Sequence, residues 1–275
     1  MTHPDSAEDI VNKGLDLFKE GKVEESFLCL DKAIGMEPKN MDFWNTKGML
    51  LFQLERFVES IKCWDSALEI NPHNENTWSM KGISLQKLNQ AQEAIFCFDK
   101  VLEINPRLAE VWAYKGVAHS SLNQYQEAVM CYEKAIQIDS KNTKSWNNKG
   151  VVHSNLNQNQ QALYCFDKAI EIDPRNALAW ENKGNHFSTL GEFEEAILCY
   201  DKSTEINLRN AGVWIKKGVI FSNLGRYPDA TGCFVIALEI EPKNEFARRE
   251  KRKCLEKMDY VGSLCGLNDE KNDPL

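Results

Sequence analysis

Hydrophobic residues recur along this chain with a period of 34 residues. Within each period, apolar side chains are spaced by three or four residues in two successive stretches, and a polar break such as Asn89-Gln90 separates them. This spacing is typical of amphipathic helices, so each period predicts two helices joined by a short turn. The asparagine that closes most periods is a candidate N-cap for the next helix. The seven periods are residues 7–40, 41–74, 75–108, 109–142, 143–176, 177–210 and 211–244.

Glycine stands at position 8 of every period, inside the first predicted helix. A tryptophan lies at position 4 of six periods, alanine or serine at position 20 of all, and an aromatic ring at position 24 of six, as in Trp78, Ala94 and Phe98. Glycine within a helix costs about 1 kcal/mol relative to alanine, so its repetition indicates a packing requirement. We expect the missing Cβ to let the two helices approach closely, with the tryptophan and the aromatic ring seated around their contact. The glycines are Gly14, Gly48, Gly82, Gly116, Gly150, Gly184 and Gly218.

This framework resembles the tetratricopeptide repeat, whose 34-residue unit is a helix-turn-helix hairpin with the same tryptophan, glycine, alanine and aromatic positions. The resemblance implies an all-α fold, a right-handed superhelical solenoid of seven such hairpins. Residues 245–258 continue the helical pattern with arginines in place of tryptophan and glycine, and are expected to form a capping helix, followed by a flexible tail over 259–275. The repeated phrase W-x-x-K-G is also similar to repeat proteins of methanogenic archaea.

The family resemblance implies a concave groove lined by positions 2, 5, 9, 12 and 13 of the first helices, which would hold an extended or helical segment of a partner. The alternative is an inner face that is merely solvated. No repeat combines the lysine and asparagine of the two-carboxylate clamp that binds chaperone tails, so that specialisation is not expected. The expected groove residues are Asn45, Met49, Phe52, Ser79, Ile83, Gln86, Ala113, Val117, Ser120, Asn147, Val151, Ser154, Asn155, Glu181, Asn185, Ser188, Val219, Ser222 and Asn223.

Two departures from the family pattern concern the outer side of the hairpins. Position 7 is lysine in every repeat, and we expect its apolar stem to cover the seam while its ammonium reaches solvent or a carboxylate. Position 22 points away from the partner helix and is apolar in five repeats, which suggests a convex interface for self-association or a second partner. Scattered surface hydrophobes are the alternative. These residues are Leu28, Phe96, Met130, Tyr164 and Leu198.

The net charge and the composition limit the classes of partner that we expect. The net charge of −8 argues against general binding to nucleic acid or to an anionic membrane. A basic stretch from Arg248 to Lys257 could contact RNA, but a solvated cap face is the favoured interpretation. The beginning of the chain is acidic and polar, unlike a secretory signal, and no run of about 18 apolar residues occurs. We therefore expect a cytoplasmic protein.

The cysteines and histidines are the candidates for chemistry. Seven of nine cysteines occupy position 23, where they are either a metal or disulfide ladder or, as we favour, small buried residues beside the helix contact. His119 and His153 occupy position 11 of successive repeats, normally a packing slot, and a catalytic or metal site there would need a further partner and a pocket. No phosphate loop, dinucleotide fingerprint or paired carboxylates occur. The sequence therefore predicts no enzyme, no cofactor and no metal.

Taken together, these features predict a non-enzymatic scaffold for protein interaction. The alternative from another class is a non-catalytic recruiting subunit of an enzyme complex, such as a transferase. Co-purification with a catalytic partner would favour the subunit, and binding to isolated peptides would favour the scaffold.

Overall fold

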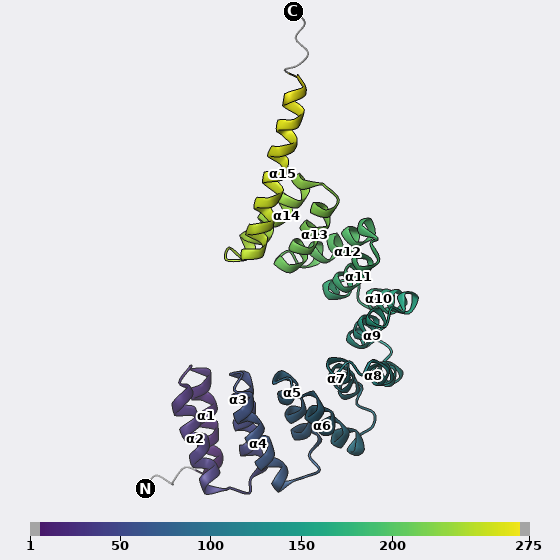
Figure 1. The fold of residues 1–275 in the computed structure, drawn as a ribbon. Helices are drawn as coiled ribbons and strands as arrows, with labels where there is room; N and C mark the ends of the chain where they lie inside the picture. Colours follow the sequence, from purple (N-terminus) through teal and green to yellow (C-terminus); the bar gives the residue numbers. More distant parts are fainter. Residues whose placement is uncertain (1–5, 270–275) are drawn as a thin grey trace, which may run out of the picture. The chain divides into compact units, whose positions relative to one another are not determined.

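The computed structural model describes residues 6–269, and side chains as far as residue 259. Over these residues the chain is all helical, with fifteen helices in a paired helix-turn-helix arrangement and no strand. Figure 1 shows the two helices of a pair side by side, as in α1 with α2 and α3 with α4. The helices are α1 (Ala7–Lys19), α2 (Val23–Met36), α3 (Met41–Gln53), α4 (Phe57–Ile70), α5 (Glu75–Lys87), α6 (Ala91–Ile104), α7 (Ala109–Ser121), α8 (Tyr125–Ile138), α9 (Thr143–Asn155), α10 (Asn159–Ile172), α11 (Ala177–Leu190), α12 (Phe193–Ile206), α13 (Ala211–Asn223), α14 (Tyr227–Ile240) and α15 (Glu245–Asp269).

The chain divides into two compact units, an N-terminal unit, Met1–Ser145, and a C-terminal unit, Trp146–Leu275. Each has its own buried residues, because a single pair cannot cover its apolar faces and needs a neighbour. In the N-terminal unit one core cluster joins α1 and α2 to α3, and another joins α5 and α6 to α7. In the C-terminal unit α13, α14 and α15 share a cluster.

Side-chain caps and left-handed turns set the helix ends. The asparagine side chains expected as N-caps accept backbone N–H bonds, for example Asn74 from Thr77 at 2.9 Å and Asn244 from Ala247 at 3.0 Å. Position 15 of every pair, between its helices, has a positive φ. Glycine or asparagine adopts this conformation readily, and one glutamate, Glu55, adopts it at φ 58°. The sequence predicted a polar break here, and the backbone conformation explains which residues fill it.

The position-8 glycines face the aromatic rings of position 24, as expected. A Cβ on Gly82 would lie 2.6 Å from the Phe98 ring, and one on Gly116 would lie 2.7 Å from Tyr132. Both rings are fully buried, so they have no room to move. Gly14 is the exception, because its repeat carries Leu30 at position 24 and its nearest neighbours would lie 3.2 Å away.

The tryptophans of position 4 pack at the margin of the core clusters and make a further contact. They are half-buried, and in five repeats the indole N–H donates to the carbonyl oxygen six residues earlier, as Trp78 does to Pro72 at 2.8 Å. The indole needs an acceptor when it is partly buried, and the turn that ends the preceding pair supplies one. The tryptophans therefore tie each pair to the one before it. The same bond joins Trp44 to Pro38, Trp112 to Pro106, Trp180 to Pro174 and Trp214 to Leu208.

In five repeats the lysine of position 7 reaches an aspartate, as one of the two expected outcomes. The ammonium of Lys81 lies 2.5 Å from Asp65 and 5.3 Å from the centre of the Trp78 ring. Each such aspartate stands 16 residues earlier, on the second helix of the preceding pair, so the ion pair crosses a junction between pairs. The further pairs are Lys47 with Asp31, Lys115 with Asp99, Lys183 with Asp167 and Lys217 with Asp201.

The position-23 cysteines of α4, α6, α8, α10, α12 and α14 are buried, each at most 5% exposed. Burial raises the pKa of the Cys97 thiol to about 12 and that of the Cys63 thiol to about 11. A thiol with so high a pKa is a weak nucleophile at neutral pH. These residues therefore act as small packing groups, which is the interpretation favoured from the sequence.

Helix α15 packs on α14 and α13 and repeats part of the framework. Arg248 occupies the position of a tryptophan, and its guanidinium donates to the Pro242 carbonyl oxygen at 2.7 Å, which replaces the indole bond of the other junctions. Ala247 and Cys254 of α15 are buried. The helix runs on to Asp269, past residue 258 where the sequence placed the start of a flexible tail. Residues 270–275 lie outside the described residues.

Candidate functional site

Two adjoining hollows lie along the first helices of the N-terminal unit. One, of about 710 Å³, lies at the N-terminal ends of α5 and α7 and includes Met49 of α3, and the other, of about 480 Å³, lies towards their C-terminal ends. They share Ile83 and Tyr114, so we treat them as one feature, the α5–α7 groove. Its apolar side chains are Met49, Met80, Ile83, Leu108, Val111, Tyr114, Val117, Leu122 and Ile138.

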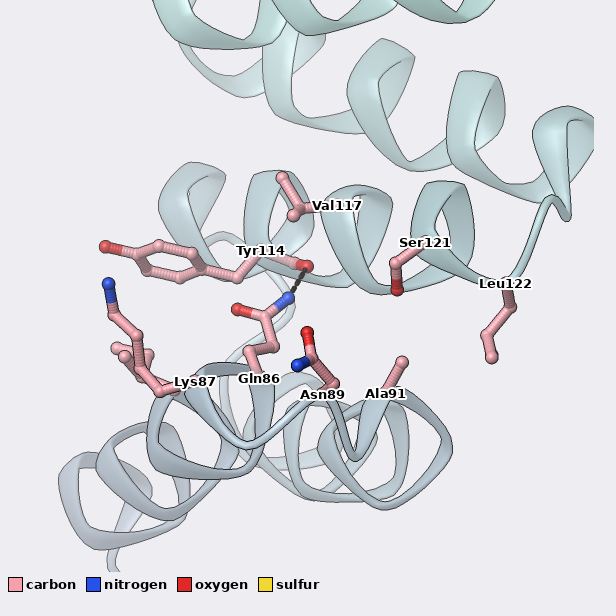
Figure 2. A pocket seen from close by; sticks show the side chains of 9 residues that line it. Gln86, Lys87, Asn89, Ala91, Tyr114, Val117, Ser121 and Leu122 are labelled. Carbon is pink, nitrogen blue, oxygen red and sulfur yellow. Dashed lines mark hydrogen bonds between the residues drawn. The ribbon is translucent and has the colours of Figure 1, made fainter. Parts of the chain in front are cut away.

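One wall of the groove is held rigidly, and the side-chain amide of Gln86 in the groove is already hydrogen-bonded. Figure 2 shows Gln86 of α5 pointing up to α7, where its amide nitrogen donates to the Tyr114 carbonyl oxygen at 2.7 Å. The Tyr114 ring stacks on Phe98 with 5.9 Å between ring centres, which fixes its orientation. Met49 and Val117 are each 40% exposed, so apolar area remains open to a ligand. The arrangement provides a preformed apolar surface on a helical framework.

The C-terminal unit has a smaller hollow, of about 390 Å³, between α11 and α13 and reaching α15. Asn185 and Ser188 line one side, Lys216 and Asn223 line the other, and Phe246 of α15 stands at the end. The Tyr200 hydroxyl donates to the Asn185 side-chain oxygen at 3.0 Å. Burial raises the pKa of that phenol to about 12, so it stays a neutral donor.

A half-buried ion pair borders this hollow. Lys216 lies 2.6 Å from Glu181, and Asn210 donates a second hydrogen bond to the same carboxylate at 3.1 Å. The Glu181 side chain is 15% exposed, whereas that of Lys216 is 40% exposed. The carboxylate is therefore satisfied within the protein, and the lysine keeps part of its surface for a ligand.

The structure brings about half of the sequence-predicted groove residues to these hollows. Several of the others bond across junctions between pairs. Asn45 accepts from Thr77 at 2.9 Å, and Asn147, 3% exposed, accepts from Asn182 at 3.1 Å. The residues at the hollows are Met49, Ser79, Ile83, Gln86, Val117, Asn185, Ser188, Val219 and Asn223. Those that do not line them are Asn45, Phe52, Ala113, Ser120, Asn147, Val151, Ser154, Asn155, Glu181 and Ser222.

Position 6 contributes lining residues to both hollows, and the sequence did not predict them. Met80, Tyr114 and Lys216 all occupy this position, two residues before the framework glycine. It was not among the positions taken from the family resemblance. Phe246 was also missed, although continuing the 34-residue count into α15 places it at position 2. A second signal is that position 6 varies between repeats from methionine to tyrosine to lysine, as expected for a residue not fixed by packing.

The apolar residues of position 22 form a second exposed set, which we call the second-helix row. Leu28, Phe96 and Met130 are 70%, 55% and 58% exposed in the N-terminal unit, and Tyr164 and Leu198 are 55% and 65% exposed in the C-terminal unit. Phe96 packs edge-on against Trp78, and Lys100 lies over its ring at 5.6 Å. The exposed ring is therefore held in place by its own repeat.

The histidines have structural partners. The ring Nδ1 of His119 lies 2.7 Å from the Gln124 amide oxygen, and His153 makes the same bond to Gln158 at 2.6 Å. His186 is buried, with its Nδ1 2.7 Å from the Ser154 hydroxyl, and burial lowers its pKa. Within residues 6–269 no three side chains of histidine, cysteine, aspartate or glutamate are grouped to hold a metal ion.

Family models decide the identity of the fold. Models described as tetratricopeptide repeat match residues 41–74, 76–108, 109–142, 143–176 and 165–197, which together make up more than half of the chain. The chain belongs to the tetratricopeptide repeat family. Proteins of this family are generally non-catalytic scaffolds for protein interaction.

Solved structures with this fold have low sequence identity to the chain. A tetratricopeptide repeat protein from Parabacteroides merdae is 17% identical with a TM-score of 0.75, and the match covers 90% of this chain and 98% of that one. A chain of the APC/C hetero-tetramer Cut9-Hcn1 is 16% identical with a TM-score of 0.67, covering 88% and 48%. YrrB, described as having an unusual peptide-binding site, is 23% identical with a TM-score of 0.50, covering 69% and 97%. Because the sequence identities are low, these structural matches establish only the fold of the chain.

Two further comparisons bear on the expectations. No curated protein sequence matches the chain. In the part of the chain that the structure describes, no helix is both long enough and apolar enough to cross a membrane. The cytoplasmic location and the likeness to archaeal repeat proteins stay predictions.

Proposed function

We propose that this protein is a non-enzymatic interaction scaffold that binds a segment of a partner protein along its first helices. The observation that carries the proposal is the α5–α7 groove, where apolar side chains line a preformed surface and Met49 and Val117 stay 40% exposed. Rigid helices hold these side chains, so a partner orders little of the scaffold when it binds. The YrrB structure, described as having a peptide-binding site, is consistent with such a use of the fold.

The experiment is a selection of peptides from a random library against the full chain, followed by titration calorimetry of the selected peptides. Met49→Lys and Val117→Lys place a charge on the groove at exposed positions, and we expect each to weaken binding about tenfold or more. Val58→Lys on α4 is the matched control, because it adds the same charge at an exposed apolar residue outside both the groove and the second-helix row. Circular dichroism of all three variants checks that they keep the helical fold.

Opposite results would reject the proposal. If no peptide is selected, or if selected peptides bind both lysine variants as well as the original protein, the groove is a solvated face. The alternative of a recruiting subunit is separated by affinity capture from the native cell, where a catalytic protein retained in fixed ratio would favour it.

We also propose that the second-helix row is a contact surface for self-association or for a second partner. Its exposed aromatic residue in the N-terminal unit, Phe96, is held by Trp78 and Lys100, so little side-chain freedom is lost on contact. Light scattering of the original protein and of Phe96→Glu measures the mass at high concentration. A monomer in both samples removes the self-association hypothesis.

A further inference from the structure

Acidic residues at the starts of the first helices distinguish one part of the chain from the other. The first turns of α1, α3, α5 and α7 each contain a carboxylate, at Glu8 and Asp9, Asp42, Glu75 and Glu110. The first turns of α9, α11 and α13 contain none. The contrast lies on the helices that form the hollows.

The helix dipole does not explain this contrast. Carboxylates near a helix N-terminus are favoured by about 0.3–1 kcal/mol, and this preference applies equally to every helix. Most second helices follow it in both parts of the chain, since α4, α6, α12 and α14 begin with an acidic first turn and α10 does not. Something beyond helix stability therefore separates α5 and α7 from α11 and α13.

Two of the carboxylates lie at the groove. Glu75 and Glu110 line its larger hollow together with Arg107. Neither glutamate has an ion pair with another described residue, although the position-25 aspartates of the same unit are paired with lysines. This end of the groove thus carries two carboxylates and one guanidinium, and its carboxylates are open to a cation from outside. At the opposite end stands Lys87.

The mainly apolar lining favours a helical ligand over an extended one. An extended segment needs hydrogen-bond partners for its backbone, whereas a helix satisfies its own. Few polar side chains of the lining could serve an extended backbone, because the Gln86 amide nitrogen is already bonded to the Tyr114 carbonyl oxygen, which leaves Asn76, Ser79 and Asn89. The apolar lining, in contrast, includes Met49 and Met80, whose flexible side chains adapt to the surface of a bound helix. The 13-residue helices α5 and α7 are about 20 Å long, enough for about three to four turns of ligand.

We propose that the α5–α7 groove binds an amphipathic helix of a partner protein, with its apolar face on Ile83, Tyr114 and Val117 and with lysine or arginine side chains beside Glu75 and Glu110. This inference rests on the proposed function and names the chemistry of the partner. The apolar face gives contact area at i, i+3, i+4 and i+7, and the charges set the preference and the orientation.

Two designed peptides test it. Both are helices of about 16 residues with leucine and alanine on one face, and they differ only in carrying lysine or glutamate along the flank. We expect the full chain to bind the lysine peptide about tenfold more tightly at low salt, with the difference shrinking as salt rises. In the double variant Glu75→Lys with Glu110→Lys, the preference is expected to reverse. Glu127→Lys, an exposed first-turn glutamate of the second helix α8, is the matched control and keeps the original preference.

The outcomes separate this inference from the proposed function. The inference is overturned if the two peptides bind equally or if the glutamate peptide binds more tightly. It is also overturned if the double variant is folded by circular dichroism and keeps the original preference. Failure of both peptides to bind overturns it as well. In each case, the proposed function would stand if library peptides bind the original protein and no longer bind Val117→Lys. If no library peptide depends on the groove for binding, both the inference and the proposed function are rejected.

Discussion

The α5–α7 groove and the hollow between α11, α13 and α15 are built at the same repeat positions from different side chains. Position 9 supplies Met49, Ile83 and Val117 to the first, and Asn185 with Val219 to the second. Position 6 supplies methionine and tyrosine to the groove, but Lys216 to the hollow. Because the framework glycines, rings and junction bonds are the same in both units, these differences leave the fold unchanged. They teach that the repeat can change the lining of its hollows without changing its framework.

The largest expected effect comes from the framework that the two units share. Gly82→Ala and Gly218→Ala put a Cβ within 2.8 Å of a fully buried ring, Phe98 or Phe234, and we expect each to lower the free energy of unfolding by about 1–3 kcal/mol. Gly14→Ala faces Leu30 with more room and is expected to be nearly neutral or stabilising, because alanine favours the helix. Urea unfolding of the three variants gives the comparison. Equal losses at Gly14 and Gly82 would contradict the packing explanation.

A smaller effect should distinguish the C-terminal unit by its response to acid. His186 is buried there, and burial lowers its pKa below the ordinary 6.5. The unfolded chain then takes up a proton near pH 6.5 while the folded chain stays neutral at this site. Stability from this group is therefore present above pH 6.5 and is lost as pH falls from there towards the folded pKa. Other repeats have Leu50 or Ile220 at the same position.

The test is thermal melting between pH 7.5 and 5.5. We expect His186→Leu to lose less stability over this range than the original protein, whatever its stability at pH 7.5. His73→Gln, at an exposed position, is the control for the loss of a histidine that is not buried. An unaltered pH dependence in His186→Leu would show that another group causes the acid response.

The smallest effect concerns the turns between paired helices. Glu55 of the N-terminal unit has φ 58°, where a Cβ is unfavourable, whereas Gly191 fills the same position in the C-terminal unit. We expect Glu55→Gly to raise the free energy of unfolding by about 0.5–1 kcal/mol and Gly191→Ala to lower it by about 1 kcal/mol. Asn89→Gly is a control with a smaller gain, because asparagine tolerates this conformation. Chemical denaturation measures all three, and a loss of stability in Glu55→Gly would contradict the strain.

Much of the framework was predictable, because it is periodic. The paired helices, the asparagine caps and the ring against Gly82 follow from residue type and spacing, and the structure confirms them. The role of Trp78 was not predictable in the same way. Its acceptor is the carbonyl oxygen of Pro72 in a turn, and hydrophobic spacing carries no information on where a backbone carbonyl points. The lining of the α5–α7 groove was predicted only in part, since Tyr114 lies outside the positions expected there.

The sequence by itself determined that this protein is built of repeated helix pairs, because the spacing of apolar residues and the absence of a Cβ at one position act within each pair. Only the tertiary structure decided which variable side chains remain available. Asn45 and Asn147 are polar residues at position 5, which the sequence assigned to the groove. In the structure both bond across a junction between neighbouring pairs. Glu75 and Glu110, in contrast, find no ion partner among the described residues. Such differences arise from distances between segments about 30 residues apart, which are set when one pair packs on the next.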